Sequence, residues 1–406
     1  MPEAVIVATA RSPIGRAFKG TLTSIRPDDL VVQMIAAALA KVPQLDPAGI
    51  DDLMLGCGLP GGEQGYNMAR AVAVMLGYDS LPGTTITRYC SSSLQTTRMA
   101  FHAIKSGEGD AFISAGVECV SRFGKGSSDS WPDTKNPVFE PAEERGAEAA
   151  KGGGAPWHDP RQDGQIPDVY LAMGQTAENV AQLRGVSRLE QDEFGVRSQN
   201  RAEKAIADGF WQRDITPATL PDGTVVSADD GPRAGTTLEK VSTLQPVFRP
   251  DGTVTAGNCC PLNDGAAAVI VMSDRKAAEL GLTPLARIVS TGVTALSPEI
   301  MGLGPVEASR QALARAGMTI DDIDLVEINE AFAAQVIPSY RELGVDLDKL
   351  NVNGGAIAVG HPFGMTGARI TSTILNSLQF HDKTFGLETM CVGGGQGMAM
   401  IFERLS

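Results

Sequence analysis

The chain has 406 residues, of which 43% are hydrophobic, and its formal net charge is −14 at pH 7. The length and apolar content suffice for two or three domains with buried cores, whereas the acidic excess argues against general nucleic-acid binding, because phosphates attract basic surfaces. The sequence has no run of about 18 consecutive apolar residues, and "MPEAVIVATARSP" at its start lacks the regions of a signal peptide, so we expect no membrane insertion.

Strand and helix patterns alternate through the first part of the chain. Apolar runs predict strands at 4–10, 53–56, 85–89 and 111–115. Apolar residues with helical spacing predict helices at 30–42, at 68–76 and from residue 92 onward. Such alternation is typical of an α/β domain with a largely parallel sheet.

The stretch "TITRYCSSSLQ" places Cys90 where a predicted strand gives way to a predicted helix. Serine is a good N-cap residue, and the free N–H groups of a first helical turn favour an anion. A thiol at such a position tends to have a lowered pKa and to act as a nucleophile. Cysteine is also a small hydrophobic residue that is often buried, and this stretch alone does not separate the two interpretations.

From about residue 123 to 169 the chain is dense in Gly, Pro, Asp and Glu and has no sustained periodicity, which is typical of a functional covering loop. Helical patterns resume at residue 173 and after Ser187, where Ser187 and Glu190 form a capping-box pattern. A second turn-rich stretch, 218–258, precedes "DGAAAVIVMS", which predicts a buried strand that ends near residue 273.

The C-terminal third resembles the N-terminal part. In "AALAKVPQLDPAGIDDLMLG" (37–56) and "QALARAGMTIDDIDLVEIN" (311–329), an Ala-rich helix precedes a turn and an Ile-Asp that begins a strand. Each half then has a reactive residue before a helix, followed by a strand end near glycine: Cys90 and Gly116 in the first, His361 and Cys391 in the second. Ordinary βα units can be alike by chance, but the shared order favours a duplicated α/β unit with its site between the copies.

Four stretches carry reactive side chains at predicted strand ends, where ligands bind in open α/β sheets. They are "RYCSSSLQ" with Cys90, "EINEAFAAQ" with Asn329, "NVNGGAIAVGHPFGMTGAR" with His361 and "MCVGGGQGMAM" with Cys391. One thiol can be a nucleophile and the other can move a proton, while an imidazole can activate a thiol or polarise a carbonyl. The neighbouring glycines let backbone N–H groups reach a developing oxyanion. A phosphate loop at 393–397 is not favoured, because no Lys-Ser/Thr follows.

The cysteines stand at 57, 90, 119, 259, 260 and 391 and form no CxxC pair. We interpret them as reduced thiols of a cytoplasmic protein. The adjacent Cys259 and Cys260, in a chain with four histidines, make a poor zinc site, so we expect no metal.

The whole set resembles the thiolase family, from the first strand to the last. Besides the motifs around Cys90, Asn329, His361 and Cys391, the family pattern is matched by "RSPIG" (11–15), "GVECVSR" (116–122), "MGQTAENVA" (173–181) and "GTVTAGN" (252–258). The resemblance implies an α/β fold in which duplicated domains form a layered αβαβα core with an inserted loop domain. We assign 1–121 and 252–273 to the N-terminal half, 122–251 to a domain that covers CoA and substrate, and 274–406 to the C-terminal half.

The resemblance also implies roles for the reactive residues. Cys90 matches the nucleophile that carries the acyl group as a thioester, and Cys391 matches the acid/base. His361 matches the residue that activates the nucleophile and contributes to one oxyanion hole, which a water held by Asn329 completes. The backbone N–H groups of Cys90 and Gly393 match the second hole. Contacts with CoA or the acyl group are implied for Met173, Phe248, Ala256, Cys260, Met301 and Phe332.

The implied reaction is CoA-dependent cleavage of a 3-ketoacyl-CoA to acetyl-CoA and a shortened acyl-CoA, as in fatty-acid β-oxidation, or the reverse Claisen condensation. CoA is then a substrate, no cofactor is bound, and we expect a homodimer or homotetramer. One alternative is a ketoacyl-synthase-like condensing enzyme, but such relatives use a second histidine where this chain has Cys391. The other is a silent acyl-CoA or lipid carrier, which is expected to have lost a catalytic residue.

The chain also departs from the family pattern. Ser93 stands where glycine is common, Ala172 stands where many short-chain members have a histidine, and Cys260 replaces a serine that contacts CoA. The last two changes remove polar contacts with CoA, so we expect apolar contact with an acyl chain longer than that of acetoacetyl-CoA, and a degradative direction.

Overall fold

Two sets of strands meet edge to edge in a computed structural model that describes residues 2–125 and 133–406. The first set is β1 (Ala4–Arg11), β3 (Asp52–Cys57), β4 (Gly83–Ile86), β5 (Ala111–Cys119) and β8 (Asn263–Ser273), with the short β2 (Gly15–Arg16) beside β8. The second set is β9 (Ala286–Ala295), β10 (Leu325–Ile328), β11 (Phe385–Val392) and β12 (Gln396–Arg404). A short antiparallel pairing of β1 with β9 joins the two sets.

Both sets repeat one pairing pattern. In the first, β1, β8 and β5 are antiparallel neighbours, and β5, β3 and β4 are parallel neighbours. In the second, β9, β12 and β11 are antiparallel, β11 and β10 are parallel, and a parallel bridge between Val326 and Leu350 takes the place of β4. The duplicated α/β fold is therefore confirmed. The strands predicted within residues 4–118, which are β1, β3, β4 and β5, run in one direction, as expected. The whole sheet is nevertheless mixed, because β8 and β12 run against both of their neighbours.

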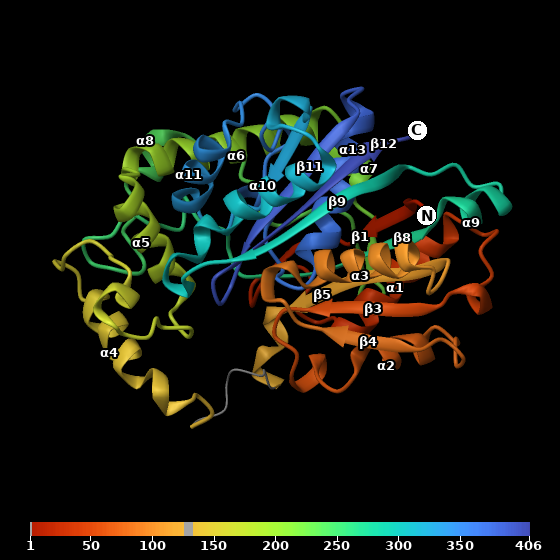
Figure 1. Ribbon diagram of the computed structural model, residues 1–406, viewed down its shortest axis with the longest axis horizontal. Helices are drawn as coiled ribbons and strands as arrows, with labels where there is room; N and C mark the ends of the chain where they lie inside the picture. Colours follow the sequence, from red (N-terminus) through yellow and green to blue (C-terminus); the bar gives the residue numbers. More distant parts are fainter. Residues whose placement is uncertain (1, 126–132) are drawn as a thin grey trace.

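Helices cover both faces of each set (Figure 1). α1 (Pro27–Ala40) and α2 (Met68–Met75) pack on the outer face of the first set. α3 (Ser92–Ser106) and α13 (Thr366–Phe380) lie between the sets, and α10 (Gly304–Ala316) and α11 (Ala333–Leu343) cover the outer face of the second. Because side chains alternate along a strand, β1 gives Val5 and Val7 to the outer core and Ala4 and Ile6 to the central one. The expected αβαβα layering is confirmed.

The predicted capping box is present. The Ser187 hydroxyl accepts the backbone N–H of Glu190, and the Glu190 carboxylate accepts the backbone N–H of Ser187 at 2.8 Å. Because these bonds satisfy two donors of the first turn, α6 (Arg188–Ala207) begins where the sequence indicates.

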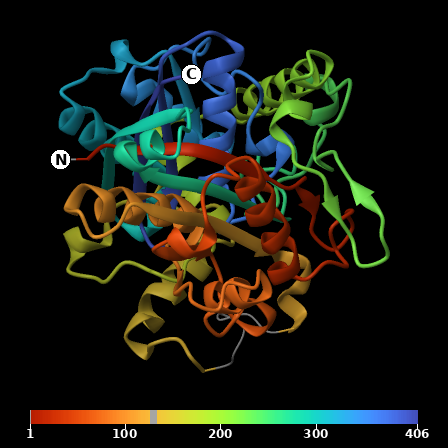
Figure 2. The same ribbon diagram turned by 90° about the vertical axis from the view of Figure 1, so that its right-hand side faces the viewer.

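The remaining helices lie mostly in the covering segment, 122–251, part of which lies beside the layers (Figure 1). They are α4 (Glu140–Ala149), α5 (Met173–Arg184), α6, α7 (Phe210–Asp214) and α8 (Leu238–Val241); outside the segment are α9 (Asp274–Glu279) and α12 (Ala356–Val359). Short 3₁₀ turns are η1 (Pro47–Gly49), η2 (Gly62–Gln64), η3 (Tyr89–Ser91), η4 (Val120–Lys125), η5 (Pro137–Phe139), η6 (Pro160–Asp163), η7 (Pro298–Leu303) and η8 (Ile320–Asp322). The hairpin β6 (Ala218–Thr219) and β7 (Val225–Val226) lies next to the N-terminal part of the chain in Figure 2.

The predicted loop from about 123 to 169 is partly helical, because α4 and two 3₁₀ turns form within it. Its residues 126–132 lie outside the described part of the chain. Among the described residues, no helix has the length and apolar character needed to cross a membrane.

Candidate active site

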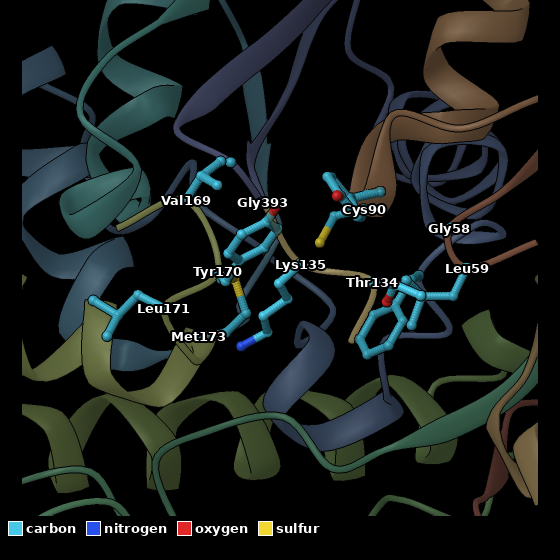
Figure 3. A pocket seen from close by; sticks show the side chains of 13 residues that line it. Gly58, Leu59, Cys90, Thr134, Lys135, Val169, Tyr170, Leu171, Met173 and Gly393 are labelled. Atoms are coloured by element: carbon cyan, nitrogen blue, oxygen red, sulfur yellow. The ribbon is translucent and has the colours of Figure 1, made fainter. Parts of the chain in front are cut away.

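Cys90 lies in η3, the short turn between β4 and α3. The strand predicted over 85–89 ends earlier, at Ile86, because the backbone turns at Tyr89, whose φ of 43° lies in the left-handed region. A cavity of about 450 Å³ opens beside Cys90 (Figure 3). It is lined by Gly58, Leu59, Tyr89, Cys90, Thr134, Lys135, Val169, Tyr170, Leu171, Met173, Phe363, Gly393 and Gly394.

The Cys90 thiol is protonated at neutral pH. Burial raises the pKa of Cys90 to about 11, and the backbone N–H groups of Gly393 and of Cys90 itself offset this only in part. The expected lowering of this pKa by the start of the helix is therefore wrong, because desolvation outweighs the favourable N–H groups. A base must take the proton before the sulfur can attack.

His361 has the properties of such a base. Burial, together with the charge of Arg369, lowers the pKa of His361 to about 3, so the imidazole is neutral. Its Nδ1 lies 2.6 Å from Oγ1 of Thr366, and that hydroxyl donates its hydrogen to the carbonyl of Pro362 at 2.7 Å. Since a hydroxyl has one hydrogen, Thr366 accepts from Nδ1–H, and the lone pair of His361 is at Nε2.

Asn329 faces this lone pair. Its Nδ2 lies 3.3 Å from Nε2 of His361, and its backbone is held by bonds from the Gln335 side chain and to Thr389. The Asn329 Oδ1 atom is buried and has no hydrogen-bond partner among the described residues. An unpaired buried acceptor suits the predicted role of holding a water, which stays a prediction.

Cys391 joins the site from the end of β11. Burial raises the pKa of Cys391 far above its usual value, and the neighbouring Cys90 raises it further, so the two sulfurs are within electrostatic reach. The His361 ring packs against Phe363 with the ring centroids 5.3 Å apart, and Phe363 lines the Cys90 cavity. The two halves of the chain therefore bring the predicted reactive residues to one place.

The residues predicted to contact CoA or the acyl group are spread along a path. Met173 lines the Cys90 cavity, and the rings of Phe248 and Phe332 meet edge to face with centroids 6.2 Å apart. The backbone N–H of Cys260 donates to Ala331, which precedes Phe332. Burial raises the pKa of Cys260, and the thiols of Cys259, Cys90 and Cys391 raise it further. Cys260 therefore lies close to both reactive sulfur atoms. Met301 does not line the cavity itself but is buried in the core cluster against which Met173 and Phe248 pack.

Ala256 instead lines a second cavity, of about 300 Å³. Its other lining residues include Arg16, Arg233 and Lys240. Three cationic side chains therefore line this second cavity. Ala256 and Cys260 belong to one loop, so this loop connects the second cavity with the sulfur atoms of Cys90 and Cys391.

Sequence reasoning missed Glu118, which is fully buried. Its carboxylate accepts the N–H groups of Gly58 at 2.7 Å and Gly364 at 2.8 Å, and so ties the loop after β3 to the loop that follows His361. The motif "GVECVSR" could have drawn attention to it. No periodicity in the covering segment could have indicated Lys135, Tyr170 or Leu171.

The family models "Thiolase, N-terminal domain" and "Thiolase, C-terminal domain" match residues 4–275 and 282–404. The chain belongs to the thiolase family. It is 42% identical to a 3-ketoacyl-CoA thiolase of Bacillus subtilis over 99% of this chain and all of that protein. It is also 42% identical to the 3-oxoadipyl-CoA/3-oxo-5,6-dehydrosuberyl-CoA thiolase of Escherichia coli over the full length of both. The dimeric peroxisomal thiolase of Saccharomyces cerevisiae superimposes with a TM-score of 0.87 at 35% identity, covering 99% of this chain and 97% of that one.

This thiolase is therefore an acyltransferase that uses CoA as a substrate. The carrier and ketoacyl-synthase alternatives are not favoured. Within the described residues, no group of three or more His, Cys, Asp and Glu side chains is placed to hold a metal ion.

Proposed function

We propose that this thiolase cleaves 3-ketoacyl-CoA through an acyl-Cys90 intermediate. The observation that carries the proposal is the placement of the Cys90 thiol in an open cavity, under the N–H of Gly393, with a neutral His361 that carries its lone pair at Nε2 and can accept a proton there.

In the first half-reaction, His361 Nε2 takes the proton of Cys90, and the sulfur attacks the ketone carbon of the substrate. The bond between that carbon and the neighbouring CH₂ then breaks, which leaves the acyl group on Cys90 and releases acetyl-CoA as its enolate. Cys391 protonates the enolate carbon. The protonated Nε2 of His361, next to Asn329, donates to the enolate oxygen, and the N–H groups of Cys90 and Gly393 face the oxygen of the acyl group.

In the second half-reaction, the Cys391 thiolate takes the proton of an incoming CoA. The CoA sulfur attacks the thioester and forms the shortened acyl-CoA, and the Cys90 sulfur leaves and recovers its proton from His361. Run backward, the same steps form a carbon–carbon bond between two thioesters. Thiolates are both good nucleophiles and good leaving groups, so one sulfur serves in both half-reactions.

CoA is proposed to lie along the path from the second cavity to Cys90. Arg16, Arg233 and Lys240 would face its phosphates, because cations are the natural partners of that group. Phe248 and Met173 would contact the pantetheine arm or the acyl chain. The apolar lining near Cys90, which includes Leu59 and Leu171, supports acyl chains longer than acetoacetyl and a degradative direction.

We also propose a homodimer formed through β4. This strand ends the path of the sheet, and its free edge can pair with the same strand of a second copy. Exposed apolar side chains lie near it, with Tyr66 fully exposed and Met75 45% exposed. Light scattering at micromolar concentration tests the assembly, and a fully active monomer would contradict it.

Two further parts of the proposal concern the domain limits and the location of the protein in the cell. The domain limits proposed from the sequence, with 252–273 in the N-terminal half, are supported by the place of β8 between β1 and β5. A cytoplasmic location is supported by the cysteines, all of which are described and free of disulfides.

Mass spectrometry tests the acyl intermediate directly. The protein is incubated with acetyl-CoA or a 3-ketoacyl-CoA and the reaction is then quenched. The acyl group is expected on the peptide that contains Cys90. Acylation of Cys391 alone would reverse the two roles. Loss of the absorbance of a magnesium-complexed 3-ketoacyl-CoA is expected only with free CoA, whereas binding without turnover would indicate a carrier.

A further inference from the structure

Charged side chains are rare in the lining of the Cys90 cavity. Among the described residues that line it, Lys135 is the one cationic side chain, and none of them carries a carboxylate. The other lining side chains are largely apolar or aromatic, such as Leu171, Tyr170 and Phe363. Figure 3 shows Lys135 within the cavity beside Tyr170, with its ammonium group pointing away from the Cys90 sulfur.

The position of Lys135 is fixed by its neighbours. The ammonium lies 5.2 Å from the centre of the Tyr170 ring, and the backbone N–H of Asn136 donates to the Tyr170 hydroxyl at 3.3 Å. These contacts hold the chain around residue 135 against the segment that leads into α5. Lys135 therefore presents its charge at a defined wall of the cavity.

The ion pair that Lys135 makes can be exchanged for another. Its ammonium contacts the carboxylate of Glu143 on α4, and the two side chains are 56% and 30% exposed. Ion pairs this open to solvent contribute little net stability. A carboxylate delivered by a bound substrate can therefore replace Glu143 at low cost.

The anion that meets Lys135 belongs to the acyl group rather than to CoA. The cations proposed for the CoA phosphates, Arg233 and Lys240, lie at α8 or just before it, whereas Lys135 pairs with α4. Figures 1 and 2 place α8 and α4 at opposite ends of the covering segment. A substrate that reaches from the second cavity to Cys90 has its acyl end on the α4 side.

We propose that Lys135 binds the terminal carboxylate of 3-ketoacyl-CoA substrates whose acyl chain ends in an acid, and so extends the substrate range to dicarboxylic acyl groups. This inference rests on the proposed function, because it names a substrate class of the same site. Glu143 competes with the substrate carboxylate and holds Lys135 when a neutral acyl chain is bound.

The test compares 3-oxoadipyl-CoA with 3-oxohexanoyl-CoA. The two acyl groups have equal numbers of carbons, but the first ends in a carboxylate and the second in a methyl group. In K135M, kcat/KM for 3-oxoadipyl-CoA is expected to fall by roughly 5- to 20-fold, the effect of one partly exposed charge-assisted bond. The value for 3-oxohexanoyl-CoA is expected to stay the same. In E143Q, kcat/KM for 3-oxoadipyl-CoA is expected to rise, because the competing carboxylate is gone.

K151M is the matched control, since Lys151 pairs with Glu148 in the same covering segment but does not line the cavity. It should leave both substrates unaffected. An equal loss for both substrates in K135M, or no loss for either, overturns the proposal. A wild-type enzyme that cleaves only 3-oxohexanoyl-CoA also overturns it and leaves the proposed function intact, whereas CoA-dependent cleavage of neither substrate contradicts the proposed function itself.

Discussion

Replacing Thr366 with valine tests whether one hydroxyl sets the proton position on His361. The substitution keeps the shape of the side chain and removes the oxygen that lies 2.6 Å from His361 Nδ1. The Nδ1–H would then be buried without an acceptor, because Thr366 is its partner in the structure and His361 is 1% exposed.

The size of the effect follows from that lost bond. A buried donor without a partner costs about 1–3 kcal/mol. The imidazole avoids this cost by moving its hydrogen to Nε2, where Asn329 could turn its carbonyl oxygen to accept it. The lone pair is then no longer at the atom that must deprotonate Cys90, so kcat is expected to fall by about 5- to 150-fold.

The assay follows CoA-dependent loss of magnesium-complexed acetoacetyl-CoA. T366S keeps the oxygen and should retain most of the activity. T371V is the matched control for removal of a buried hydroxyl from the same helix, because Oγ1 of Thr371 lies 2.8 Å from the Glu388 carboxylate and 3.0 Å from the Gly367 carbonyl, away from the imidazole. If T366V kept more than half of the wild-type kcat, or if T366S were as impaired as T366V, the tautomer argument would be refuted.

Further predictions concern the reactive residues and two buried acids. H361A and C391A should each lower kcat by roughly 10²–10⁴, as expected for proton-transfer groups and oxyanion donors, and N329A should lower it less; steady-state rates decide the order. E118A should lower the melting temperature, because buried N–H groups lose their acceptor at about 1–3 kcal/mol each. Burial raises the pKa of Glu327 from 4.5 to about 8, so between these values the native state holds a proton that the unfolded state has released. Glu327 should therefore make stability fall as pH rises through that window, by up to about 1.4 kcal/mol per pH unit. Glu388 and Glu118 also have raised pKa values, so melting curves of E327Q should show a shallower fall than those of the wild type.

The sequence could predict those parts of the site that depend on local chemistry. Cys90, His361 and Cys391 were placed at the ends of elements, because apolar runs mark strands and glycines mark where the backbone must approach closely. The repeat also survived in the structure, where η1 and η8 precede β3 and β10 in the same way. These features depend on residues that are close together in the sequence, so a single sequence is enough to predict them.

Features that depend on tertiary contacts could not be predicted. The pKa of Cys90 is set by desolvation, and burial of a thiol results from both halves closing over it, not from the serines that follow. The antiparallel course of β8 arises because residues far along the chain return between β1 and β5. Lys135 reaches the cavity from a segment with no periodicity, so neither spacing nor composition could indicate it.

The electrostatics of the site explain why the thiol can be kept protonated and still react. Moving the proton from Cys90 to His361, between pKa values of about 11 and about 3, costs about 11 kcal/mol without any attraction between the products. Unit charges about 4 Å apart return about 4 kcal/mol at an effective dielectric constant of 20. The remaining cost of about 7 kcal/mol lies well below the barrier of about 16 kcal/mol for an enzyme that turns over about 10 times per second. The resting site therefore holds neutral groups, which burial favours, and the ion pair forms only as the sulfur attacks and passes its charge to the substrate oxygen.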